Sequence, residues 1–185
     1  PKPVAEFAKG LQGEAAFRYG VCTCGENAGN AMELLHKDFP MDSAYSLVMP
    51  NNYVLGSQLE SDAIVREKLR RAKERLPEIA GEIRARKPCW QVEKGPQPRL
   101  RTKLIHPFFD RFATSTQPFF ATDACIGCGL CARNCPAHAI TLVDNRPEWK
   151  GNCYLCTSCI NRCPVQAIQY GEKTKGRVRY VCPEE

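Results

Sequence analysis

Hydrophobic and polar positions alternate between helical and strand-like spacing over residues 1–86. Apolar side chains recur every three or four residues over 4–11, and a second helix is predicted over 28–36. Apolar runs over 17–23 and 43–49 predict two β-strands, and each is followed by turn-forming glycine, proline or asparagine residues. This order of elements predicts an α/β fold for the first part of the chain.

A longer helix is predicted over residues 61–86. Its apolar positions step by three and four residues and so form one stripe. They are Val65, Leu69, Ala72, Leu76, Ile79 and Ile83. Ser61 suits the N-cap position, and Pro77 predicts a kink because proline lacks a backbone N–H and crowds the preceding turn. The opposite face alternates Glu with Arg and Lys, which is typical of a solvated helix surface.

Beyond residue 86 the composition changes twice. Residues 87–118 contain five prolines and many basic side chains, which predicts a linker. Residues 119–171 are rich in cysteine, and a polar tail over 172–185 follows them. We therefore expect a second domain over 119–171, separated from the first by the linker.

The positive charge gathers in one stretch and does not by itself predict a nucleic-acid partner. The chain has a formal net charge of +6, and residues 84–111 alone hold eight basic residues against two acidic ones. Neither a basic nucleic-acid-binding fold nor a base-stacking motif accompanies that charge. The sequence also lacks an apolar run of about eighteen residues, so we expect no nucleic acid and no membrane among its partners.

Twelve cysteines among 185 residues indicate either a disulfide framework or metal binding. Eight of them lie within residues 125–163, at spacings too short for most of them to bridge neighbours without strain. Metal binding is therefore the better explanation, and it indicates the reducing cytoplasm of a cell that lives with little oxygen. Of the other four, Cys22 and Cys24 share one face of a predicted strand and are expected as buried thiols, whereas Cys89 and Cys182 are isolated.

The cysteine-rich region is an internal repeat with a period of 28 residues. Each copy has the pattern C-x2-C-x2-C-x3-C-P, and an Ala-Ile pair suited to a short strand follows at 139–140 and at 167–168. The first copy holds Cys125, Cys128, Cys131 and Cys135, and the second holds Cys153, Cys156, Cys159 and Cys163. This pattern binds [4Fe–4S] clusters, whereas structural zinc sites favour four ligands in two separated C-x2-C pairs.

The spacing also predicts which cysteines share a cluster. Three cysteines placed three residues apart wrap round one iron–sulfur cube, and the proline turn carries the fourth to the other cube. The predicted ligands are Cys125, Cys128, Cys131 and Cys163 for the first cluster, and Cys153, Cys156, Cys159 and Cys135 for the second. This crossed pattern ties the two copies together and brings the clusters close enough for fast electron exchange.

On the doubled cysteine pattern, residues 119–171 resemble the bacterial two-[4Fe–4S] ferredoxins, which have an α+β fold. Residues 3–7, 22–29 and 48–53 are similar to a family of anaerobe proteins in which a flavodoxin-like domain precedes a two-cluster ferredoxin domain. The resemblance implies a partial flavodoxin-like α/β domain over 1–86, followed by the ferredoxin-like domain.

In that family a turn like the one at residues 23–30 lies beside the isoalloxazine ring of FMN. The resemblance therefore implies that Thr23, Cys24, Gly25 and Asn27 contact the FMN ring. The strand and the Ser/Thr/Gly-rich loop that hold the FMN phosphate in flavodoxin-like domains are not found in this sequence. We therefore expect FMN only together with an N-terminal half that this sequence lacks, or with a partner.

These features predict low-potential electron transfer through two [4Fe–4S] clusters, with a flavoprotein or another oxidoreductase as redox partner. An electron carrier is favoured over an enzyme, because the sequence shows no paired carboxylates, activated nucleophile or phosphate loop. Two alternatives stay open. One is the electron-input part of an FMN-dependent reductase, and the other is a binding module whose clusters only hold the fold.

Overall fold

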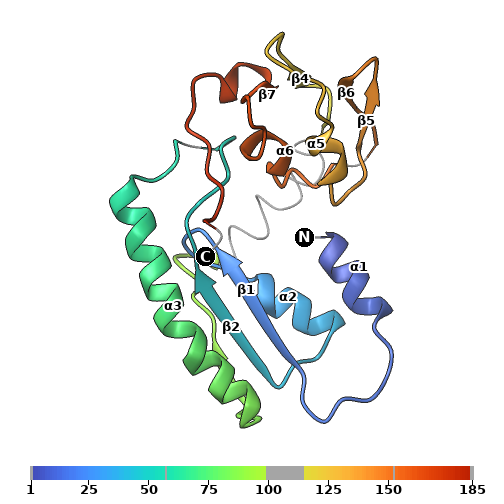
Figure 1. Cartoon of the computed structure of the whole chain (residues 1–185). Helices are drawn as coiled ribbons and strands as arrows, with labels where there is room; N and C mark the ends of the chain where they lie inside the picture. The colour runs from blue at the N-terminus through green and yellow to red at the C-terminus, as the bar shows by residue number, and fades with distance from the viewer. Residues whose placement is uncertain (1, 57, 99–114, 152, 184–185) are drawn as a thin grey trace. The chain divides into compact units, whose positions relative to one another are not determined.

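The computed structural model describes residues 2–56, 58–98, 115–151 and 153–183 (Figure 1). The chain forms two compact units. The sheet unit comprises Pro1–Pro50 and Ser61–His106, and the cluster unit comprises Asn51–Glu60 and Pro107–Glu185. Residues 99–114 of the predicted linker lie outside the described part of the chain.

Three parallel strands form the centre of the sheet unit. They are β1 (Tyr19–Cys24), β2 (Ser43–Val48) and β3 (Cys89–Gln91), in the order β1-β2-β3. The register places Tyr19 opposite Ser43, and Ser43 opposite Cys89. Their parallel arrangement confirms the α/β prediction. The third strand lies in the stretch that the sequence predicts as a linker, so the sheet extends beyond residue 86.

Helices α2 (Ala31–Asp38) and α3 (Asp62–Arg84) cover opposite faces of this sheet. Successive strand residues point to opposite faces, and Ala44 and Tyr45 of β2 follow this rule. Ala44 packs with Met32 of α2, whereas Tyr45 packs with Ala72 and Ile79 of α3. Helix α1 (Lys2–Gly10) completes the unit (Figure 1).

Helix α3 closely follows its sequence prediction. It begins at Asp62, directly after Ser61, whose backbone is extended at the N-cap position and whose side chain makes no capping hydrogen bond. The helix continues through Pro77 to Arg84. Exposed ion pairs link Glu67 to Arg70 and Arg71 on its outer face, as expected for a solvated surface. In the described part of the chain, no helix has the length and apolar character needed to cross a membrane.

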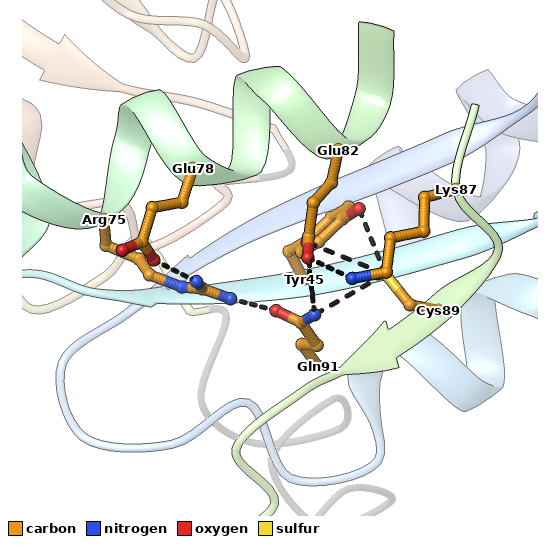
Figure 2. A network of polar contacts seen from close by, with 7 residues as sticks. All are labelled: Tyr45, Arg75, Glu78, Glu82, Lys87, Cys89 and Gln91. Atoms are coloured by element: carbon orange, nitrogen blue, oxygen red, sulfur yellow. Dashed lines mark hydrogen bonds and ion pairs between the residues drawn. The ribbon is translucent and has the colours of Figure 1, made fainter. Parts of the chain in front are cut away.

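A polar network attaches β3 to the sheet and to α3 (Figure 2). Gln91 donates from Nε2 to Glu82 at 3.1 Å, and Lys87 forms an ion pair with Glu82 at 2.7 Å. The Cys89 thiol donates to the hydroxyl of Tyr45 at 3.1 Å. Burial raises the pKa of Tyr45 to about 12. Cys89 therefore has a structural role in this unit.

In the part of the chain that the structure describes, the cluster unit has four strands, which form two antiparallel pairs. Its elements are β4 (Phe119–Ala121), α5 (Leu130–Arg133), β5 (Ile140–Val143), β6 (Arg146–Trp149), α6 (Ser158–Asn161), β7 (Ile168–Tyr170) and the 3-10 helix η1 (Gly171–Thr174). Strand β5 pairs with β6, which brings Ile140 opposite Trp149, and β4 pairs with β7, which brings Ala121 opposite Ile168. The two pairs are related by the 28-residue repeat, and a strand begins within each Ala-Ile pair, at Ile140 and at Ile168, as predicted.

Residues 51–60 and the C-terminal stretch complete the core of the cluster unit. Val54 is fully buried, and it packs in one cluster with Phe119, Leu155, Ile160, Ile168 and Tyr170. Arg177 donates to the Val54 carbonyl at 2.7 Å. Thr174 is also fully buried, and its hydroxyl accepts a hydrogen bond from the Tyr170 N–H at 2.8 Å. The described part of the predicted polar tail therefore packs onto the cluster unit.

Candidate iron–sulfur centre

The eight cysteines of the repeat line two separate hollows in the cluster unit. Each hollow encloses about 350 Å³ of empty space, part of which opens to solvent. The first is lined by Cys125, Cys128, Cys131 and Cys163, and the second by Cys135, Cys153, Cys156 and Cys159. Each hollow thus receives three cysteines from one copy and the fourth cysteine of the other copy. These are the two groups that the sequence predicts.

The local backbone explains how three closely spaced cysteines turn toward one hollow. Gly129 and Thr157 occupy equivalent positions of the repeat, immediately before the short helices α5 and α6. Both have a left-handed backbone, with φ of 72° and 57°. Gly127 also has a positive φ, and a side chain there would come within 2.8 Å of the Asn145 carbonyl oxygen. Glycine is therefore required where the chain passes closely round the first hollow.

Backbone N–H groups point at several of the cysteine sulfurs. Ala139 donates to Cys135 Sγ at 3.3 Å, and Ala167 donates to Cys163 Sγ at the same distance. These two contacts are equivalent in the repeat, and each involves the crossing cysteine. Hydrogen bonds of this kind favour the thiolate form that binds iron.

The raised pKa values of several ligand thiols indicate a site whose thiolates require a metal cation for stability. Burial raises the pKa of the Cys131 and Cys153 thiols, and it raises the pKa of Cys159 to about 12. Neighbouring cysteines raise the pKa of Cys153 further, and Cys135 of the other copy is one of them. Thiolates crowded in this way are stable only with cations between them, and metal binding must release their protons.

The donor set fits iron–sulfur clusters. Thiolates are soft ligands of the kind that select iron–sulfur clusters, and four of them surround each hollow. Within the residues that the structure describes, no three His, Cys, Asp or Glu side chains converge as they would round a single metal ion. Four ligands spread round a hollow provide the corners that a cube requires.

The comparisons with known proteins agree with this geometry. Residues 124–167 match the family model of the 4Fe-4S dicluster domain. The protein carries two [4Fe–4S] clusters. The match covers the repeat and leaves the sheet unit unidentified. No solved structure matches the chain.

Two curated relatives are similar to the cluster-binding part. An uncharacterized polyferredoxin-like protein of Methanocaldococcus jannaschii is 45% identical over 51 residues, which are 28% of this chain. The formate dehydrogenase iron-sulfur subunit of Haemophilus influenzae is 33% identical over 71 residues, covering 32% of this chain. In both cases this chain spans only 22% of the length of the relative.

The predicted FMN contacts lie together at the carboxyl end of β1. Thr23 and Cys24 are its last two residues, and Gly25 and Asn27 lie in the loop that follows. The side chain of Thr23 is exposed, whereas Cys24 is half-buried and burial raises the pKa of its thiol. A side chain on Gly95 would collide with Asn27, so the loop after β3 closely approaches this turn. FMN contact by these residues stays a prediction.

One feature of the site was not predicted from the sequence, namely the packing of residues 51–60 against the second copy of the repeat. Trp149 lines the second hollow together with Cys159. The two copies of the repeat differ at this position, because the residue equivalent to Trp149, 28 positions earlier, is Ala121. This difference is the sequence signal that singles out the tryptophan. Residues 51–60 contain no cysteine and no local pattern that points to the cluster unit.

Proposed function

We propose that this protein transfers single electrons between redox proteins through its two [4Fe–4S] clusters. The observation that supports this most strongly is the crossed lining of the two hollows. The proposed ligands are Cys125, Cys128, Cys131 and Cys163 for the first cluster, and Cys153, Cys156, Cys159 and Cys135 for the second. Each copy of the repeat supplies ligands to both clusters. The two clusters therefore lie side by side in one small unit, as electron exchange between them requires.

Each hollow also has one exposed cysteine through which a partner can be reached. Cys128 in the first hollow and Cys156 in the second are exposed, and they occupy equivalent positions of the repeat. The other six proposed ligands are of intermediate exposure. A partner that docks at either exposed ligand approaches the cluster edge without having to open the unit.

The proposed partners are oxidoreductases or flavoproteins, and the proposed site of action is the cytoplasm. One of the two relatives is by its name the iron-sulfur subunit of a formate dehydrogenase, which supports an oxidoreductase partner. A flavin would allow one-electron and two-electron chemistry to be exchanged. The turn after β1 supports this coupling, because open α/β sheets bind ligands at the carboxyl ends of their strands. Low-potential thiolate clusters persist where thiols stay reduced.

Oxygen-free purification followed by iron analysis and redox titration tests the proposal. We expect about eight irons per chain and two reversible one-electron reductions at low potential, observed by electron paramagnetic resonance. Zinc, or far fewer irons, would contradict the cluster assignment. Eight irons without any reversible reduction would instead support clusters that only hold the fold, and turnover of a small substrate by the reduced protein would support the reductase alternative.

A further inference from the structure

Trp149 places a buried hydrogen-bond donor in the wall of the second hollow. It is the last residue of β6, and its ring stacks on Phe119 with the ring centroids 5.3 Å apart and an angle of 8° between the planes. Its indole Nε1 atom is buried and has no well-formed hydrogen bond among the residues that the structure describes. A buried N–H without an acceptor is costly, so its position requires an explanation.

The sulfur of Cys159 explains this position. Trp149 and Cys159 line the same hollow. Burial raises the pKa of the Cys159 thiol, whereas the Trp149 indole N–H lowers it. This agrees with a buried, unpartnered Nε1 in the wall of the hollow that holds this sulfur. A thiol is a weak acceptor, but a thiolate ligand carries negative charge and accepts hydrogen bonds more strongly.

Among the described residues that line the first hollow, none is a tryptophan equivalent to Trp149. The repeat relates the pair of Ile140 and Trp149 to the pair of Ile168 and Ala121. Alanine therefore occupies the position in the first copy that is equivalent to Trp149, and its methyl group cannot donate a hydrogen bond. The two halves of the cluster unit, similar in backbone, thus differ in one polar group that faces a ligand sulfur.

We propose that the Trp149 indole N–H donates a hydrogen bond to the Cys159 sulfur and thereby raises the reduction potential of the second cluster. The inference rests on the proposed function, since it takes Cys159 as a ligand of that cluster. One-electron reduction adds negative charge to the cluster and its sulfurs, so a donor at a ligand sulfur stabilises the reduced state more than the oxidised state. Trp149 is a positioning and tuning residue that acts through Cys159.

Two replacements separate the N–H from the packing of the ring. Trp149→Phe keeps an aromatic ring beside Phe119 but removes the donor. Replacing Trp149 by β-(3-benzothienyl)alanine keeps the shape of the indole and changes only the N–H to sulfur. In both variants we expect about eight irons per chain and a shift of one cluster's reduction equilibrium toward the oxidised state. The equilibrium constant for reduction of that cluster should fall by up to about tenfold, which lowers its reduction potential by about 59 mV for a one-electron couple. The potential of the other cluster should be unchanged.

Trp90→Phe is the matched control, because it makes the same substitution at a tryptophan that lines neither hollow. We expect it to change neither potential. A second readout uses the wild-type protein with 15N in its indole rings, where hyperfine spectroscopy of the reduced protein should detect coupling from one indole nitrogen.

Unchanged potentials in the benzothienyl variant at full iron content would overturn the proposal, whatever Trp149→Phe does. If neither variant holds its iron, the absence of an indole nitrogen coupling in the wild-type protein would overturn it. A wild-type chain without eight irons or without reversible reduction would overturn the proposed function instead.

Discussion

The backbone carbonyl of Asn52 accepts a hydrogen bond from the Thr157 hydroxyl at 3.1 Å, although 105 residues separate them in the sequence. The same carbonyl accepts a second hydrogen bond, at 2.9 Å, from the side-chain amide of Asn161. Thr157 directly follows Cys156, a proposed ligand of the second cluster. A segment that joins β2 to α3 along the chain thus supports the backbone of the second cysteine copy. The cluster unit is therefore discontinuous in sequence, and residues 51–60 belong to it.

Val54→Ala should destabilise the cluster unit. Val54 is fully buried in the core formed with Ile160 and Ile168, and truncating it removes apolar contacts and leaves a cavity. We expect a loss of about 2 kcal/mol in the free energy of unfolding, measured by anaerobic denaturant titration of the loaded protein with cluster absorbance as the signal. Val178→Ala is the control, because Val178 is 73% exposed and its truncation should cost little. Equal effects of the two substitutions would show that Val54 is not part of this core.

Thr157→Val should weaken the same unit through its polar contacts. The substitution removes the hydroxyl that donates to Asn52 and keeps a β-branched side chain at a residue with positive φ. The loss of a buried hydrogen bond predicts about 1–2 kcal/mol of destabilisation, together with faster loss of iron on exposure to a chelator. Thr157→Ser retains the hydroxyl and should remain close to the wild-type protein. A valine variant that matches the serine variant in both measurements would contradict a supporting role for this contact.

The sequence predicts the features that local pattern determines. The cysteine spacing alone leads to the two groups that surround the hollows, because the reach of each ligand is set within a few residues. The strands at 19–24 and 43–48 and the long helix α3 also carry their own periodicity. Pro77 predicts a kink on local grounds; the helix continues through it to Arg84, and the kink itself stays a prediction.

Features that depend on distant partners could not be predicted in this way. Strand β3 has only three residues in a basic, proline-rich stretch, and it is defined by parallel pairing with β2 and by the contacts of Gln91 with Glu82. The segment with Asn52 and Val54 likewise has no pattern of its own. Its position depends on hydrogen bonds and apolar contacts with residues more than 100 positions away. Patterns within a short stretch of sequence do not predict such contacts.

Alkaline pH should destabilise the sheet unit through Tyr45. Burial raises the pKa of this phenol from its ordinary value of 10.0 to about 12. The unfolded chain therefore releases the phenolic proton at lower pH than the folded chain does. The contribution to stability is fully present below pH 10 and is lost as the pH rises from about 10 to about 12.

Tyr45→Phe removes this ionisation and should flatten the fall in stability over the same pH window. The measurement is the unfolding midpoint of α3 and the sheet by circular dichroism at several pH values between 9 and 12. Tyr19→Phe serves as the control, since Tyr19 lies on the edge strand and is 49% exposed. A Tyr45→Phe variant with the same alkaline profile as the wild-type protein would show that this phenol does not contribute to the pH dependence.

Paired substitutions can test the crossed ligand assignment. If Cys135 and Cys156 bind the same cluster, the double variant Cys135→Ser with Cys156→Ser should lose one cluster and keep the other. We expect about four irons per chain. Electron paramagnetic resonance of the reduced protein should show the signal of one intact cluster. Cys135→Ser with Cys128→Ser removes one ligand from each cluster and should damage both.

The uncrossed alternative predicts the reverse, because Cys128 and Cys135 belong to the same copy of the repeat. In that case the second double variant would keep one intact cluster and the first would damage both. Cys182→Ser gives the control for thiol loss in general, since Cys182 is exposed and lines neither hollow, so it should retain about eight irons. The geometry favours the crossed result, since Cys135 raises the pKa of Cys153 across the two copies and lines the hollow that holds it.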